Sequence, residues 1–291
     1  MTAKIIDGKA IAKAVRVGIA DRAAALKRRG VHSSLVMVVV GNNPASQVYV
    51  RNKVRACADV GIRSQVIRYP HETSEKLLLD AIRGFNADSS VHGILVQLPL
   101  PPHISVRRVL ETISADKDVD GFHLYNVGGL VIGQTVFPPC TPYGVQKILE
   151  HEGIELEGKN VTVVGASNIV GKPMALILMQ REATVAICHA KTRDLAEYTL
   201  LADILVVAAG SANLIRADMI REGAAVIDVG INILPDGKLV GDVDFERVKE
   251  KAGWITPVPG GVGPMTVTML LENTVAAAER ASGSRRREAS A

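Results

Sequence analysis

Residues 40–61, VGNNPASQVYVRNKVRACADVG, join a buried strand to a helix. The apolar run 35–40 predicts the strand, turn residues follow it, and apolar residues then recur at helical spacing. Tyr49 and Lys53 lie four residues apart and Ser46 lies three before Tyr49, so all three project from one face of the predicted helix. A hydroxyl, a phenol and an amine at this junction can form one wall of a reaction site. Alternatively, Lys53 is a solvated surface charge and Tyr49 a partly buried packing residue, since most lysines on helices are surface charges.

The composition is that of a globular α/β protein. The chain has 291 residues, which suggests two domains of roughly 150 residues each. Hydrophobic residues make up 47% and aromatic residues only 3%, so the core is aliphatic and suits a parallel sheet buried on both faces. The formal net charge is +4, and much of this excess comes from the arginines at 285–287. Nucleic-acid binding is therefore not indicated.

The three cysteines indicate a reducing compartment. Cys57, Cys140 and Cys188 are far apart, odd in number and without metal-ligand spacing, which predicts buried thiols and no metal site. Charged residues interrupt the amino-terminal stretch, unlike a signal peptide. No run approaches the roughly 18 apolar residues of a membrane helix. We therefore expect a cytoplasmic protein that binds neither a membrane nor nucleic acid.

Apolar runs that alternate with helical patterns predict the domain organisation. In the first half, the run 93–98 ends in prolines, so the polar Gln97 lies near the carboxyl end of a buried strand, where ligands bind in open α/β sheets. The second half alternates regularly, as a nucleotide-binding βαβ unit does. The Gly- and Pro-rich segment 126–142 lacks helical periodicity and suits an interdomain cleft. We expect a catalytic domain at 1–140 completed by a helix at 264–281, a cofactor domain at 141–263 and a disordered tail at 282–291.

A glycine-containing loop follows the strand predicted at 160–164. Residues 165–173, GASNIVGKP, lead from that strand into a helix, but Ser167 replaces the second glycine of the G-x-G-x-x-G pattern. Gly165 permits a tight turn, and amides at the helix start can face a pyrophosphate. The loop alone fits a plain strand-to-helix connection equally well.

The end of the next predicted strand bears on the choice of cofactor. An NAD enzyme usually places a carboxylate here for the ribose 2′-hydroxyl, but none precedes Asp194. Lys191 and Arg193 would instead attract a 2′-phosphate. The pattern favours NADP over NAD, unless both residues are ordinary surface charges.

A further loop is dense in Pro and Gly. It reads ITPVPGGVGPMT at 255–266, and its glycines allow a backbone to approach a ligand closely. Pro264 fits the first turn of the final helix. Two interpretations are possible: the loop closes over a bound cofactor, or it forms a tight turn between the domains.

Four strings in order resemble the bifunctional methylenetetrahydrofolate dehydrogenase/cyclohydrolase (FolD) family, over about residues 6–277. They are PASQVYV at 44–50 with Lys53, GILVQLPLP at 93–101, KDVDG at 117–121 and PVPGGVGPMT at 257–266. The resemblance implies two α/β domains flanking a cleft, the second a Rossmann-type dinucleotide-binding domain. It also implies NADP-dependent oxidation of 5,10-methylenetetrahydrofolate, hydrolysis of the methenyl product to 10-formyltetrahydrofolate, and a homodimer.

The resemblance also implies roles for individual residues. Lys53 is expected to assist proton transfer in the hydrolysis, with Gln97 aiming it. Tyr49 is expected to position the reacting ring, and Asp120 to accept hydrogen bonds from the pterin. The expected substrate contacts are Tyr49, Ser46, Gln97, Asp120, Pro259, Gly260 and Gly263. The expected cofactor contacts are Gly165, Ala166, Ser167, Ile169, Val170, His189, Ala190, Lys191 and Ile231.

Two positions depart from the family pattern. Many relatives carry Arg where this chain has Ala166, and Ser where it has Ala190, and both positions lie near the expected 2′-phosphate. Two other functions stay open: another two-domain NADP dehydrogenase, such as one acting on a shikimate-like acid, and a non-catalytic nucleotide-binding or scaffold protein. The expected catalytic residues favour the folate enzyme; they are Tyr49, Lys53, Gln97 and Asp120. An absorbance assay would distinguish this enzyme from a non-catalytic scaffold.

We predict that NADP is used more efficiently than NAD, because Lys191 and Arg193 attract a 2′-phosphate and no carboxylate repels it. The measurement is kcat/KM for the dehydrogenase reaction with each cofactor. An equal or higher value with NAD would refute the prediction and point to Ala166 and Ala190 as the cause.

Overall fold

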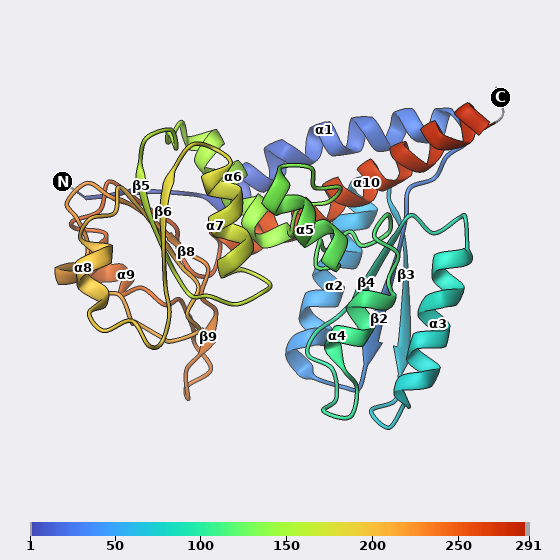
Figure 1. Ribbon diagram of the computed structural model, residues 1–291, viewed down its shortest axis with the longest axis horizontal. Helices are drawn as coiled ribbons and strands as arrows, with labels where there is room; N and C mark the ends of the chain where they lie inside the picture. The colour runs from blue at the N-terminus through green and yellow to red at the C-terminus, as the bar shows by residue number, and fades with distance from the viewer. Residues whose placement is uncertain (1, 289–291) are drawn as a thin grey trace. The chain divides into compact units, whose positions relative to one another are not determined.

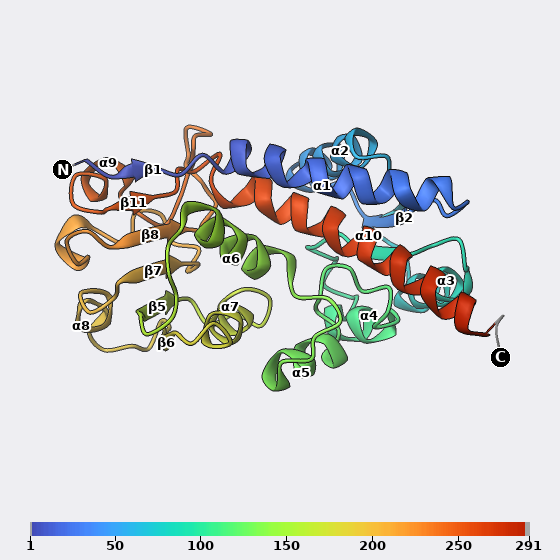
Figure 2. The same cartoon turned by 90° about the horizontal axis from the view of Figure 1, so that it is seen from above.

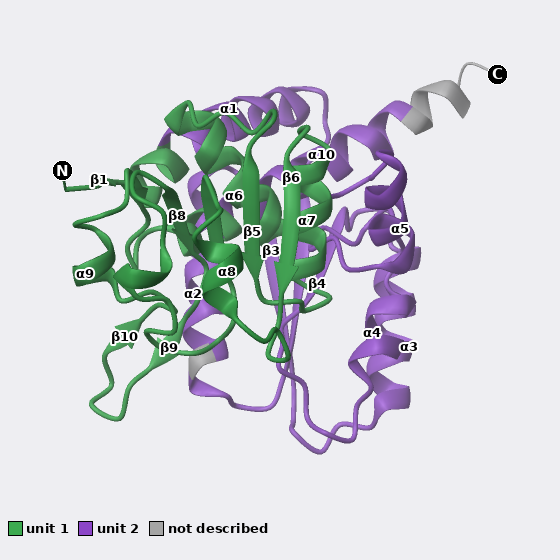
Figure 3. Ribbon diagram, turned by 60° about the vertical axis from the view of Figure 1, so that its left-hand side comes forward, with its two compact units in different colours: residues 1–13, 139–266 green, residues 14–138, 267–291 purple. Residues whose placement is uncertain are grey.

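The structure is a computed structural model that describes residues 2–288 (Figure 1). The chain forms two compact units, coloured separately in Figure 3. Unit 1 comprises residues 1–13 and 139–266, and unit 2 comprises residues 14–138 and 267–291. No helix within 2–288 is long and apolar enough to cross a membrane.

Unit 2 is built on a three-stranded parallel sheet in the order β3-β2-β4. The central strand reads SLVMVVV and is buried on both faces, as the apolar run predicts. Alternate residues Val36, Val38 and Val40 pack against α3 and α4 through Leu78 and Val109. The elements of this unit are β2 (Ser34–Val40), α2 (Pro44–Asp59), β3 (Arg63–Tyr69), α3 (Glu75–Ala87), β4 (Gly93–Val96), α4 (Val106–Thr112) and α5 (Leu124–Ile132).

Two long helices, α1 (Gly8–Arg28) and α10 (Val262–Glu288), contribute residues to both units. The side chain of Asp7 accepts hydrogen bonds from the N–H groups of Lys9 and Ala10 at the start of α1, as an N-cap does. Within unit 2 the helices lie side by side (Figure 2), and Arg22 forms ion pairs with Glu272 and Glu279. These ion pairs fasten α10 to α1.

Unit 1 contains a six-stranded parallel sheet in the order β1-β11-β8-β7-β5-β6. From β5 the chain passes first to β6 on one side and then to β7 on the other, the strand order of a dinucleotide-binding fold. A two-stranded hairpin, β9–β10, stands apart from it. The elements are β1 (Lys4–Ile5), α6 (Cys140–Glu152), β5 (Asn160–Val164), α7 (Gly171–Met179), β6 (Thr184–Cys188), α8 (Leu195–Thr199), β7 (Ile204–Val207), a 3₁₀ turn (Ala217–Met219), β8 (Ala225–Asp228), β9 (Asn232–Ile233), β10 (Leu239–Val240), α9 (Phe245–Val248) and β11 (Trp254–Ile255).

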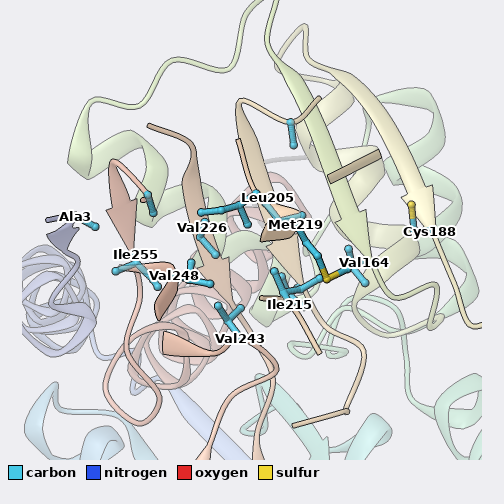
Figure 4. Packing of buried hydrophobic residues seen from close by; sticks show 14 residues of the cluster. Ala3, Val164, Cys188, Leu205, Ile215, Met219, Val226, Val243, Val248 and Ile255 are labelled. Atoms are coloured by element: carbon cyan, nitrogen blue, oxygen red, sulfur yellow. The ribbon is translucent and has the colours of Figure 1, made fainter. Parts of the chain in front are cut away.

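One buried cluster fills a face of this sheet (Figure 4). Leu205 of β7 and Val226 of β8 contribute to it with Met219, and each strand residue is fully buried. The buried members are aliphatic apart from Cys188 and Met219, and the aromatic Phe245 is only partly buried against them, which agrees with the low aromatic content. The sheet is therefore held together by close aliphatic packing.

The structure confirms the α/β class and the Rossmann-type second domain, and it corrects three expectations. Residues 1–13 group with unit 1 instead of the catalytic domain, because β1 pairs with β11 and Ala3 is buried in the unit 1 cluster. The segment 126–142, expected to be irregular, begins inside α5, which Gly133 ends in a left-handed conformation. The tail expected to be disordered from 282 is helical to Glu288 because α10 continues, while 289–291 lie outside the described residues.

We predict that Leu205→Ala destabilises the protein by about 2–5 kcal/mol, because a fully buried leucine leaves a cavity that the sheet cannot close. The free energy of unfolding in urea measures this. The control is Leu77→Ala, since Leu77 is 54% exposed and its truncation should cost at most about 0.5 kcal/mol. Equal effects of both changes would contradict the assignment of the core.

Candidate active site

Lys53 and Gln97 are brought together in unit 2. Lys53 lies on α2, and its Nζ donates a hydrogen bond to Gln97 Oε1 at 3.0 Å. Gln97 follows β4 directly, and its own Nε2 donates to the carbonyl of Leu98 at 2.7 Å. This second bond fixes which end of the amide faces the lysine. Both side chains are half-buried, so the amine is oriented and still accessible.

The other two residues of the predicted helical face differ in exposure. Tyr49 precedes Lys53 by one turn and is 41% exposed, so its ring is available to a ligand. Ser46 is only 5% exposed, and its N–H donates to the side chain of Asn43, which caps α2. Tyr49 and Lys53 therefore form the accessible part of this face, with Ser46 beneath them.

Asp120 lies in a loop that is anchored by its neighbour. Asp118 is 1% exposed, and its carboxylate accepts hydrogen bonds from the N–H groups of Gly121 and His123 at 3.2 and 2.7 Å and from the Asn126 side chain at 2.9 Å. Asp120 itself is half-buried. Asp118 was not among the expected site residues. The string KDVDG offers two carboxylates, and the spacing does not say which one is buried.

The Pro- and Gly-rich loop of unit 1 approaches the start of α1 closely. A Cβ placed on Gly8 would lie 1.8 Å from the carbonyl oxygen of Gly261, so only glycine fits there. Gly260 has a φ of 112°, a conformation that favours glycine. Pro259 and Gly263 are exposed and Gly260 is half-exposed. The loop therefore presents backbone at the positions expected to contact substrate.

The loop after β5 is a cradle that dinucleotide binding requires. Gly165 has a φ of 124°, and a Cβ there would lie 2.1 Å from the carbonyl oxygen of Ala208. A Cβ on Gly171 would lie 1.9 Å from the carbonyl oxygen of Gly165. The Ser167 hydroxyl accepts hydrogen bonds from the N–H groups of Val170 and Gly171 at the helix start. Gly165 thus allows the tight turn and Gly171 the close helix packing that the glycines of a dinucleotide-binding loop provide.

The remaining loop positions are open to a ligand. Ser167 and Ile169 are exposed, while Ala166 and Val170 are partly so. After β6, the side chains of His189, Ala190 and Lys191 are exposed, as is Arg193. Ile231, after β8, is 48% exposed. The residues present therefore fit a dinucleotide along the carboxyl ends of these strands.

The first carboxylate after β6 is already engaged. Asp194 caps α8, and its side chain accepts a hydrogen bond from the N–H of Ala196 at 2.9 Å. This leaves Lys191 and Arg193 as the charges that a phosphate on the ribose would meet.

Within residues 2–288 no group of three or more His, Cys, Asp or Glu side chains could hold a metal ion. The prediction of three buried free cysteines is confirmed for Cys57, Cys140 and Cys188.

Two family models match the chain. The catalytic domain of tetrahydrofolate dehydrogenase/cyclohydrolase matches residues 6–120, and the NAD(P)-binding domain of the same enzymes matches residues 139–282.

Similar proteins match along nearly the whole chain. The bifunctional protein FolD of Polynucleobacter asymbioticus is 60% identical over 97% of this chain and 99% of its own length. The FolD protein of Polaromonas naphthalenivorans is 59% identical over 96% of this chain and 100% of its own length.

Solved structures agree. The FolD dehydrogenase/cyclohydrolase of Campylobacter jejuni superimposes with a TM-score of 0.94 at 52% identity, covering 96% of this chain and 99% of its own. The Trypanosoma brucei enzyme, complexed with NADP and an inhibitor, gives 0.92 at 40% identity, covering 96% and 98%. A shikimate dehydrogenase of Thermus thermophilus reaches 0.51 at 18% identity over 85% of this chain and 99% of its own, a likeness of fold alone.

We predict that Asp118 makes stability depend on pH. Burial raises the pKa of its carboxyl above the ordinary 3.8, despite three N–H donors that lower it. The folded protein therefore keeps a proton that the unfolded chain releases, so this contribution is complete below pH 3.8 and is lost as the pH rises through the raised pKa. Relative to Asp118→Asn, the wild-type free energy of unfolding should fall over that interval.

Urea denaturation at successive pH values, from about pH 4 upward, measures the difference between wild type and Asp118→Asn. The variant has no carboxyl at this position to titrate. Curves that stay parallel across the series would contradict the raised pKa of Asp118.

Proposed function

Because this chain belongs to the tetrahydrofolate dehydrogenase/cyclohydrolase family, we propose that Lys53 carries its hydrolytic step and that Gln97 aims Lys53. The protein oxidises 5,10-methylenetetrahydrofolate to 5,10-methenyltetrahydrofolate with NADP and then hydrolyses the product to 10-formyltetrahydrofolate. The observation that carries the proposal is the 3.0 Å hydrogen bond between Lys53 Nζ and Gln97 Oε1 at the carboxyl edge of a parallel sheet.

In the first step the methylene carbon loses a hydride and becomes the methenyl cation. NADP, held by the loops after β5 and β6, would supply the hydride acceptor. The task of the protein is alignment, since no proton carrier is needed for hydride transfer. Gly165 and Gly171 let the backbone approach the pyrophosphate, while Lys191 and Arg193 offer positive charge to the 2′-phosphate. Ile231 presents an apolar side chain.

In the second step a water molecule adds to the methenyl carbon, a proton leaves, and the ring opens to the formyl product. We assign Lys53 to proton transfer because its amine is oriented by Gln97 and accessible beside Tyr49. The Lys53 amine is proposed to take the proton that leaves the attacking water.

Side chains of unit 2 are proposed to recognise the folate. Asp120 is proposed to accept hydrogen bonds from the amino and ring N–H groups of the pterin, a donor set that suits a carboxylate. Tyr49 would position the reacting ring, and Ser46 would contribute to the substrate site. Pro259, Gly260 and Gly263 would provide contacts through their backbone.

We also propose a homodimer formed through the cofactor unit. Strand β6 is an edge of the six-stranded sheet, and Ile187 on it is 44% exposed. Tyr198 and Leu201 near α8 are 43% and 67% exposed, so apolar surface gathers around that edge. Location in the cytoplasm stays a prediction, supported by the buried free cysteines.

The dimer prediction is checked by light scattering. The expected mass is twice the 31.0 kDa of the chain, and Ile187→Asp should shift it towards the monomer by placing a charge in the interface. Ile233→Asp serves as control because Ile233 is 67% exposed on the separate hairpin. A wild-type protein that is monomeric at micromolar concentration would refute the proposal.

We predict that Lys53→Met removes most cyclohydrolase activity, by roughly 10²–10⁴-fold, which is the usual worth of a positioned acid or base. Some dehydrogenase activity should survive, because hydride transfer depends on alignment. Methionine keeps the apolar stem, so α2 should persist. Both activities are followed by absorbance on one preparation whose circular dichroism matches wild type.

Two further variants control this experiment. Arg51→Met removes an exposed cation from the same helix and should leave both activities near wild type. Asp120→Ala should lower both activities while NADP affinity is retained. Cyclohydrolase activity of Lys53→Met within a few-fold of wild type would show that Lys53 is only a surface charge.

A further inference from the structure

Two buried carboxylates in unit 1, Asp228 and Asp242, stand outside the expected site. Asp228 is 3% exposed and Asp242 is fully buried. We propose that Asp242 is a positioning residue that, backed by Asp228, holds the loops after β7 and β8 in the shape that receives the nicotinamide half of NADP. The proposal rests on the use of NADP assigned above. It adds a residue that shapes the cofactor site through two loops.

Asp242 joins two loops through four hydrogen bonds. Its Oδ2 accepts from the N–H groups of Ala209 and Gly210 at 2.7 and 2.9 Å. Its Oδ1 accepts from the N–H of Ser211 at 2.9 Å and from the side chain of Asn232 at 2.8 Å. In the described part of the chain its charge is thus balanced by N–H dipoles and not by a cation. Burying a charge in this way is costly unless every lone pair is used.

Asp228 holds Asp242 in place from the end of β8. Its Oδ1 accepts from the N–H groups of Gly230 and Asp242 at 2.9 and 3.0 Å, and its Oδ2 accepts from Val243 at 2.9 Å. Burial raises the pKa of Asp228 to about 6, the backbone donors oppose that rise, and the neighbouring charge of Asp242 adds to it. All three donors are backbone N–H groups, which suit an acceptor carboxylate.

Two glycines leave room for this arrangement. A Cβ on Gly230 would lie 2.2 Å from the carboxyl carbon of Asp242, and a Cβ on Gly241 would lie 1.8 Å from Asp228 Oδ2. Neither distance is possible for a real side chain. The chain therefore closes tightly around both carboxylates, which leaves the two loops little freedom.

The loops that Asp242 holds face the crevice of the fold. In an open α/β sheet the ligand lies where the strand order reverses, here between β5 and β7. The loop from Ala209 follows β7 at that point, and the carbonyl of Ala208 lies against the Gly165 turn. Ile231 is anchored on both sides, through Gly230 to Asp228 and through Asn232 to Asp242.

The strand order places the two halves of the cofactor over different strands. The adenosine ribose is read at the end of the strand that follows the glycine loop, which is β6 with Lys191 and Arg193. The nicotinamide half must then extend over β7 and β8, where Asp242 acts. A change at Asp242 should accordingly disturb the nicotinamide end and spare the adenosine end.

The test is Asp242→Asn, which keeps the volume but replaces one acceptor oxygen by an NH₂ group that faces N–H donors. We expect the NADP KM of the dehydrogenase to rise by about tenfold or more and its kcat to fall. The cyclohydrolase reaction, which uses no cofactor, should stay within about twofold of wild type. Inhibition of the dehydrogenase by adenosine 2′,5′-bisphosphate should also be unchanged within about twofold, because this probe lacks the nicotinamide half.

Asp203→Asn is the matched control, since Asp203 lies at the opposite end of β7, where it accepts from the N–H of Asn160 and pairs with Arg221. It should leave the NADP KM unchanged. If Asp242→Asn does not fold, Asn232→Ala removes only one of the four donors and should raise the NADP KM a few-fold in the same pattern.

The outcomes separate the proposal from its premise. A wild-type protein without NADP-dependent oxidation would refute the proposed function itself. With an active wild type, an unchanged NADP KM in the folded Asp242→Asn or Asn232→Ala variant would overturn the role of Asp242. Equal weakening of adenosine 2′,5′-bisphosphate and NADP would overturn it too, by showing general damage to the unit.

Discussion

The parallel pairing of β4 with β2 is the interaction on which the arrangement of Lys53 and Gln97 depends. Residues 35–38 pair with 93–96, and the N–H of Gln97 donates to the carbonyl of Val38 at 2.8 Å just beyond the last pair. Parallel strands end at the same edge of a sheet, so Gln97 arrives beside the helix that leaves β2. A one-residue shift would turn Gln97 to the other face and separate it from the lysine.

In both units, loops that carry residues proposed to contact a ligand are anchored by a buried carboxylate. Asp118 accepts hydrogen bonds from backbone N–H groups that follow Asp120. Asp242 accepts them from the backbone of 209–211 and from the side chain of Asn232, which follows Ile231. In each case most of the donors are backbone N–H groups, and a more exposed residue nearby is proposed to contact the ligand. These hydrogen bonds add rigidity to loops that otherwise pair through single β-bridges, Ile94 with Asp118 and Ile215 with Val243.

Much of the fold and part of the site followed from the sequence. Buried runs and helix caps indicated most strands and helices, and the helical spacing of Tyr49 and Lys53 placed them on one accessible face. The contact of Lys53 with Gln97, 44 residues away, needed the family resemblance. The two-residue strand β1 is too short to show a period, so its place in unit 1 was missed. The anchoring by Asp118 and Asp242 was missed as well, because a carboxylate that binds backbone amides has no fixed sequence spacing.

The central claim is that Lys53 and Gln97 act as one unit in hydrolysis, and a double-mutant cycle on cyclohydrolase activity tests it most directly. The variants are Lys53→Met, Gln97→Leu and the two combined, each checked for folding. If Gln97 acts by aiming Lys53, the double variant should be about as slow as Lys53→Met alone, because residues that work together give strongly non-additive losses. Losses that simply multiply would contradict the account.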